Sequence, residues 1–91
     1  TFDRIAMNPP FEKDQDALHI ERAAKLLRPG GRLVAIAGDG FRWRERGHAP
    51  KVRAALSEQG RLRLKELPSD TFLGTGVSVR TCLVVFDKPA A

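Results

Sequence analysis

Residues 2–11 read FDRIAMNPPF, a short apolar strand that runs directly into an Asn-Pro-Pro-Phe turn. Proline fixes its own φ and pushes the preceding residue toward extended geometry, so two prolines in a row make a stiff turn. The side chain of Asn8 adds a carbonyl acceptor, and Phe11 adds an aromatic face for stacking. We interpret Asn8, Pro9, Pro10 and Phe11 as residues that form a pocket for binding an amine. The alternative is a turn that ends the strand, with Phe11 packed into the core.

The next two segments have the periodicities of a helix and a strand. From residue 14 or 16 to residue 27, apolar side chains recur at helical spacing after an acidic start, and Pro29-Gly30-Gly31 is the predicted stop. Residues 32–37 (RLVAIA) are apolar on both faces apart from the first residue. This pattern is typical of a parallel strand that is covered by helices on both sides.

The second half of the chain predicts one helix and two strands. We expect a loop at residues 38–48 and a short helix from Pro50 to Gly60. Residues 61–65 alternate strictly, as in an edge strand, whereas residues 77–86 become continuously apolar and should lie inside the sheet. The order strand, helix, strand, helix, strand, strand predicts an α/β fold in which the last two strands pair antiparallel.

Composition excludes several classes of protein. The apolar runs are about five or six residues long, far short of the roughly 20 that a membrane helix needs, and residues 1–30 show no signal-peptide pattern. The single cysteine, Cys82, lies in an apolar run, so we expect a buried small hydrophobe and a reducing cytoplasmic location. His19 and His48 have no partner at metal-ligand spacing, and no metal is expected.

A basic segment follows the second predicted strand. Residues 42–65 contain eight Lys or Arg against two acids, an excess that favours a polyanionic partner. Within it, arginines alternate with aromatic residues, which suits a nucleic-acid backbone and base stacking. The candidate nucleic-acid-binding residues are Phe41, Arg42, Trp43, Arg44 and Arg46. The alternatives are a solvated basic face and aromatic side chains that only anchor the loop.

The chain starts inside a strand that has the character of an interior strand. It therefore reads as a piece of a longer protein, and an unpaired edge on this first strand predicts self-association.

Three segments together resemble the C-terminal half of a class I S-adenosylmethionine-dependent methyltransferase. They are FDRIAMNPPF, LLRPGGRLVAIAGDG and LPSDTFLGTGVSVRTCLVVFDK. The resemblance covers nearly all of residues 1–91 and implies a partial Rossmann-like sheet flanked by two helices. In the family's sheet order, 3-2-1-4-5-7-6, the chain would supply strands 4, 5, 7 and 6, with strand 7 antiparallel.

Asn-Pro-Pro-Phe together with a later Phe-Leu-Gly-Thr-Gly resembles, more narrowly, the adenine-N6 DNA methyltransferases. The resemblance implies that the Asn8 side chain and the Pro9 carbonyl accept hydrogen bonds from the exocyclic amine, while Phe11 stacks on an extruded base. A second loop would border the pocket through Phe72, Gly74, Thr75 and Gly76. The alternative is that this segment is a flexible turn between two strands.

The same resemblance implies S-adenosylmethionine as cofactor and DNA as the favoured partner. Asn-Pro-Pro-Phe also occurs in ribosomal RNA guanine-N2 and protein glutamine-N5 methyltransferases, and a non-catalytic nucleic-acid-binding module is a further alternative. The glycine-rich turn that holds the methionine part of the cofactor is missing from these residues. We therefore expect the cofactor site to lie mostly upstream of Thr1 and the 91-residue chain to be inactive by itself.

Overall fold

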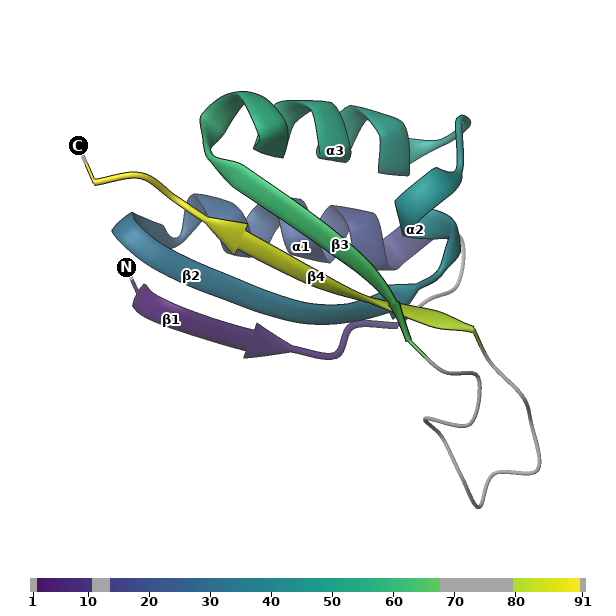
Figure 1. The fold of residues 1–91 in the computed structure, drawn as a ribbon, viewed down its shortest axis with the longest axis horizontal. Helices are drawn as coiled ribbons and strands as arrows, with labels where there is room; N and C mark the ends of the chain where they lie inside the picture. The colour runs from purple at the N-terminus through teal and green to yellow at the C-terminus, as the bar shows by residue number, and fades with distance from the viewer. Residues whose placement is uncertain (1, 11–13, 68–79, 91) are drawn as a thin grey trace, which may run out of the picture.

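The chain folds around one four-stranded mixed sheet (Figure 1). The computed structural model describes residues 2–10, 14–67 and 80–90. In spatial order the strands are β1 (Phe2–Met7), β2 (Leu27–Gly38), β4 (Thr81–Asp87) and β3 (Arg61–Leu67). β1 and β2 are parallel, and β4 lies between β2 and β3 and runs antiparallel to both. This order confirms the predicted arrangement of strands 4, 5, 7 and 6, with the seventh antiparallel.

Three helices connect the strands in the described part of the chain. They are α1 (Gln15–Lys25), α2 (Gly40–Trp43) and α3 (His48–Gln59). α1 and α3 contact each other and lie on the same face of the sheet (Figure 1). Alternate residues of β2 and β4 point to this face, and with the inner faces of the helices they form the core. The largest fully buried core side chains are Phe86, Ile20, Leu27, Leu33, Leu56, Val52 and Val84.

The boundaries around β2 differ from the prediction. α1 ends at Lys25, two residues before the predicted end at residue 27, and Pro29-Gly30-Gly31, predicted to follow the helix as a stop, belongs to β2. The backbone N–H of Gly30 donates to the Lys88 carbonyl at 2.8 Å, and the Lys88 N–H donates to the Gly31 carbonyl at 3.0 Å. These bonds satisfy the backbone of an otherwise irregular segment, so pairing with residues beyond β4 extends the strand.

Residues 38–48, predicted as a loop, contain the one-turn helix α2, and α3 begins at His48 instead of Pro50. The hydrogen bond from the Arg44 N–H to the Gly40 carbonyl, at 2.7 Å, closes this turn. α2 carries Phe41, which is buried, directly after β2.

The prediction that helices cover β2 on both sides is wrong for the part of the chain that the structure describes. Val34 and Ile36 of β2 and Leu83 and Val85 of β4 point away from α1 and α3 and are only half-buried. Both crossovers, through α1 and through α3, return over the same face, so the other face carries no helix among the described residues.

β1 pairs with β2 along one edge and is largely exposed, so among the described residues it is an edge strand. Cys82, by contrast, is fully buried in β4, and burial raises the pKa of its thiol to about 11. The thiol is therefore protonated and unreactive at neutral pH, which confirms its role as a small core residue. None of the helices in the described ranges is long and apolar enough to cross a membrane.

Candidate functional site

The carboxyl ends of β1 and β2 meet at one edge of the sheet because the two strands are parallel. Met7, the last residue of β1, pairs with Ala35, so the Asn-Pro-Pro turn lies beside the end of β2. Asn8 and Pro10 are exposed, whereas Pro9 is buried and anchors the turn. Phe11 lies outside the described residues. Ligand sites of open α/β sheets occur at this edge, so the turn lies where substrate binding is expected.

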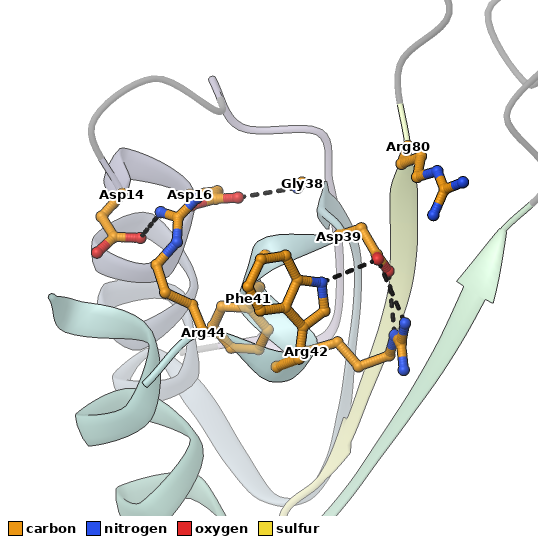
Figure 2. Close-up of a pocket in the computed structure, with 10 residues that line it drawn as sticks. Asp14, Asp16, Gly38, Asp39, Phe41, Arg42, Arg44 and Arg80 are labelled. Carbon is orange, nitrogen blue, oxygen red and sulfur yellow. Dashed lines mark hydrogen bonds and ion pairs between the residues drawn. The ribbon is translucent and has the colours of Figure 1, made fainter. Parts of the chain in front are cut away.

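A cavity of about 480 Å³ opens at the same edge, between the start of α1 and the segment that follows β2 (Figure 2). Three acidic and three basic side chains are among the residues that line it. Its lining consists of Asp14, Asp16, Gly38, Asp39, Gly40, Phe41, Arg42, Trp43, Arg44 and Arg80. Three carboxylates close to one another would repel, so the partners of each acid decide what the cavity can bind.

Asp16 joins the first turn of α1 to the end of β2. Its Oδ2 accepts a hydrogen bond from the Gly38 backbone N–H at 2.9 Å, and its Oδ1 accepts one from the Ala17 N–H at 2.8 Å. The residue is 4% exposed, and burial raises the pKa of its carboxyl above the ordinary value, against the lowering effect of the two hydrogen bonds. Both oxygens are therefore occupied by backbone donors.

Asp14 precedes α1 in the left-handed conformation, with φ at 64°. Its Oδ1 accepts a hydrogen bond from Arg44 Nη1 at 2.9 Å, and its Oδ2 accepts one from the His48 backbone N–H at 2.8 Å. One carboxylate thus fixes both ends of the segment between α2 and α3. A residue with positive φ is unusual unless its surroundings hold it there, as these two bonds do.

Asp39 holds two neighbouring side chains of α2 (Figure 2). Its Oδ1 accepts from Arg42 Nε at 3.0 Å, and its Oδ2 accepts from Trp43 Nε1 at 3.1 Å. The hydrogen bond from Arg42, supported by the one from Trp43, holds the pKa of the Asp39 carboxyl below its usual range. Asp39 is therefore ionised at neutral pH and keeps both donors in place.

The five predicted nucleic-acid-binding residues have different environments. Phe41 is 2% exposed, as the anchoring alternative predicted for it, whereas Trp43 is 59% exposed. Arg42 and Arg44 are paired with acids, and Arg46 is exposed. Their role in binding nucleic acid stays a prediction.

Arg53 of α3 further fixes this segment by donating to the carbonyls of Phe41, at 2.6 Å, and Arg44, at 2.7 Å.

Sequence reasoning missed the three acids and Arg80. Asp14 and Asp16 were interpreted only as the acidic start of a helix, and Asp39 only as part of a loop. The signal that could have found them is position, because each acid flanks a predicted strand or helix end at the edge where ligands bind. The predicted pocket loop with Phe72, Gly74, Thr75 and Gly76 lies outside the described residues. Within the described ranges, no group of three or more His, Cys, Asp or Glu side chains is arranged to hold a metal ion.

Comparison with known proteins finds the same fold as a segment of several solved structures. No protein-family model and no curated protein sequence matches the chain. A structure of a type I restriction-modification system matches with a TM-score of 0.80 and 27% identity over 98% of this chain and 22% of that chain. The M protein of the type I restriction enzyme EcoKI matches with a TM-score of 0.73 and 23% identity, over 94% of this chain and 20% of its own.

A third structure supplies the wider class. A Listeria monocytogenes protein described as a class I S-adenosylmethionine-dependent methyltransferase matches with a TM-score of 0.71 and 18% identity, over 98% of this chain and 32% of its own. The chain therefore spans less than a third of the length of each of the three structures. Its fold is shared with a segment of each of these three structures.

Proposed function

We propose that this chain is the substrate-binding part of an S-adenosylmethionine-dependent methyltransferase that acts on adenine N6 in DNA. One observation carries the proposal: an exposed Asn8 stands on a turn anchored by the buried Pro9, at the carboxyl edge of a sheet. The fold shared with a type I restriction-modification structure, at 27% identity, supports DNA as the substrate. Adenine N6 rests on the resemblance that the Asn-Pro-Pro-Phe motif and the later Phe-Leu-Gly-Thr-Gly segment carry together.

The chemistry explains why an amide and a carbonyl suit this position. The amine of adenine is a poor nucleophile because its lone pair is delocalised into the ring. Two acceptors on its N–H groups, the Asn8 side chain and the Pro9 carbonyl, would favour the more nucleophilic, pyramidal amine. No strong base is needed for this step, since fixed dipoles and alignment of the reacting atoms can supply much of the rate.

The residues that the structure describes do not supply a cofactor site by themselves. The acids of the cavity, Asp14, Asp16 and Asp39, already accept hydrogen bonds from protein donors through both oxygens, so none of them is fully available to the hydroxyls of a ribose. The chain also has no glycine-rich turn after a first strand. We infer that the cofactor site belongs to a part of the protein outside these 91 residues. Calorimetry should accordingly detect no binding of S-adenosylmethionine to the 91-residue chain.

The test is an Asn8→Ala substitution in the methyltransferase that contains this segment. With tritiated cofactor, the parent should label DNA, and the variant should lose about a hundredfold or more in kcat, as when a preorganised dipole is removed from an active site. Cofactor affinity should be retained. Gln15→Ala is the matched control, since Gln15 is an exposed polar residue at the start of α1. Full activity in the Asn8 variant would overturn the proposal.

The same assay separates the alternatives. Transfer of the tritiated methyl group to ribosomal RNA or to a protein glutamine, without transfer to DNA, would show that one of the other amines is the substrate. Salt-sensitive DNA binding without any transfer would select a non-catalytic module. The single paired edge of β1 also leaves room for self-association, for which sedimentation of the chain at several concentrations is the measurement.

A further inference from the structure

Trp43 is a large aromatic side chain that is held in place yet left open to solvent. The residue is 59% exposed, although its indole Nε1 donates to Asp39 Oδ2 at 3.1 Å. Asp39 itself is only 7% exposed and is ionised. The orientation of the ring is therefore fixed by a charge-assisted hydrogen bond, while much of its surface is free to contact a ligand.

The arginines around Trp43 fall into two groups. In the first, Arg42 pairs with Asp39 at 3.0 Å and lies 3.9 Å from Glu66, and Arg44 pairs with Asp14 at 2.9 Å. Their charges are already compensated inside the protein. In the second group, Arg46 and Arg80 are exposed and make no ion pair with any residue that the structure describes.

Arg46 and Arg80, which make no ion pair with a described residue, border different hollows, and Trp43 borders both. The cavity of about 480 Å³ has Arg80, at the start of β4, on the side of Asp39 away from α1 (Figure 2). A second, more open hollow of about 580 Å³ is lined by Trp43, Arg44, Glu45 and Arg46. An aromatic ring that borders two hollows, each lined by an exposed guanidinium group, is an arrangement suited to a base and its neighbouring phosphates.

We propose that Trp43 stacks on an unpaired base of a DNA strand, and that Arg46 and Arg80 bind the phosphates on the two sides of that base. Asp39 is a positioning residue, since it acts through the indole N–H. The inference rests on the proposed function for the choice of DNA and deepens it. It assigns to Trp43 a base other than the one presented to Asn8, because Asn8 is absent from the lining of both hollows.

Fluorescence tests this directly, because Trp43 is the only tryptophan of the chain and there is no tyrosine. The 91-residue chain is titrated with a dye-labelled thymidylate oligomer and with an abasic oligomer of equal length, and dye anisotropy reports binding. Both oligomers should bind, since both carry phosphates. Only the thymidylate oligomer should quench the fluorescence of Trp43, because the abasic oligomer has no bases to stack on the indole. Trp43→Ala should weaken thymidylate binding about tenfold and leave the abasic oligomer unaffected.

Separate measurements test the roles of Arg46, Arg80 and Asp39. Arg46→Ala and Arg80→Ala should weaken both oligomers and reduce the slope of log affinity against log salt by about 0.7 each. Lys25→Ala, at the far end of α1, is the matched control and should change neither affinity nor slope. Asp39→Asn should reduce quenching at saturation, and circular dichroism of each variant checks that it is folded.

Two results would overturn the inference. One is saturated thymidylate binding, seen by anisotropy, without quenching of Trp43. The other is equal thymidylate affinity of the parent and a folded Trp43→Ala variant. Neither result bears on the proposed methyl transfer, which Asn8→Ala tests separately. Conversely, full methyl transfer by the Asn8→Ala variant would not contradict the fluorescence result.

Discussion

Asp16 Oδ2 and the backbone N–H of Gly38 lie 2.9 Å apart and connect the first turn of α1 to the last residue of β2. Asp16→Ala leaves the buried N–H groups of Gly38 and Ala17 without this acceptor. We expect a loss of about 1–3 kcal/mol in the free energy of unfolding, measured by urea denaturation of the 91-residue chain. Burial raises the pKa of Asp16 because it disfavours the charged carboxylate, so Asp16 stabilises the fold less when it is ionised. The loss of stability caused by Asp16→Ala should therefore be smallest at neutral pH and above.

Gln15→Ala is the control for this change, because Gln15 is exposed and lies next to Asp16 in α1. Its effect should stay within about 0.5 kcal/mol. Equal stabilities of the two variants would show that the bond between Asp16 and Gly38 contributes nothing to the fold.

Gly30 and Gly47 form a matched pair for substitution. Both have positive φ, at 85° and 79°, so alanine is strained at each position. A Cβ at residue 30 would meet no atom within 4 Å, whereas one at residue 47 would collide with the carboxylate of Asp14. Gly30→Ala should cost about 1 kcal/mol from backbone strain alone. Gly47→Ala should cost more, because it also displaces Asp14 from Arg44 and His48.

Thermal denaturation of the two variants checks this difference. Equal melting temperatures would mean that the site around Asp14 adapts to the extra methyl group. The melting temperature should decrease from the parent to Gly30→Ala and should be lowest for Gly47→Ala.

The order of elements could be predicted because it depends on local pattern. The strict alternation of residues 61–65 marks an edge strand, and the continuous apolar run ending at Phe86 marks an interior one, as the structure has them. The helix α2 could not be predicted, since a single turn of four residues has no helical period of its own.

The candidate site was predicted in its location but not in its contacts. Asn8 and the segment after β2 lie at one sheet edge, as parallel pairing requires. The pairing of Asp14 with Arg44 and of Asp16 with Gly38 joins residues 30 and 22 positions apart. Such pairs depend on how α1 packs against β2, and sequence periodicity carries no information on them.

Asp87 joins the three strands β2, β4 and β3 through two arginines. Its Oδ1 accepts from Arg32 Nε at 2.6 Å, and its Oδ2 accepts from Arg63 Nη2 at 3.1 Å. The hydrogen bond from Arg32 comes first among the causes that hold the pKa of Asp87 below its ordinary value of 3.8. Because the folded pKa is the lower one, the stabilisation is present above pH 3.8 and is lost as pH falls through the folded value.

Asp87→Asn should therefore lower the free energy of unfolding at pH 7. Between pH 4 and about pH 2, the free energy of unfolding of this variant should fall less steeply than that of the parent. Added salt should reduce the difference, since the groups are accessible to solvent. Asp3→Asn is the control, because the Asp3 carboxylate is 76% exposed and lies 3.6 Å from Arg28. Urea denaturation across this pH range is the measurement, and parallel curves for parent and Asp87→Asn would contradict the prediction.

Thr81 carries a buried hydroxyl that has no hydrogen-bond partner among the residues that the structure describes. The residue begins β4 and is 0% exposed, and no donor or acceptor of the described residues reaches its Oγ1. Valine has nearly the same shape and no polar atom, so Thr81→Val should leave stability unchanged or raise it by about 1 kcal/mol. Thr81→Ser keeps the hydroxyl and removes a buried methyl group, so it should cost about 1 kcal/mol. Urea denaturation of both variants separates the two effects, and a loss of stability in Thr81→Val would mean that the hydroxyl has a partner in solution.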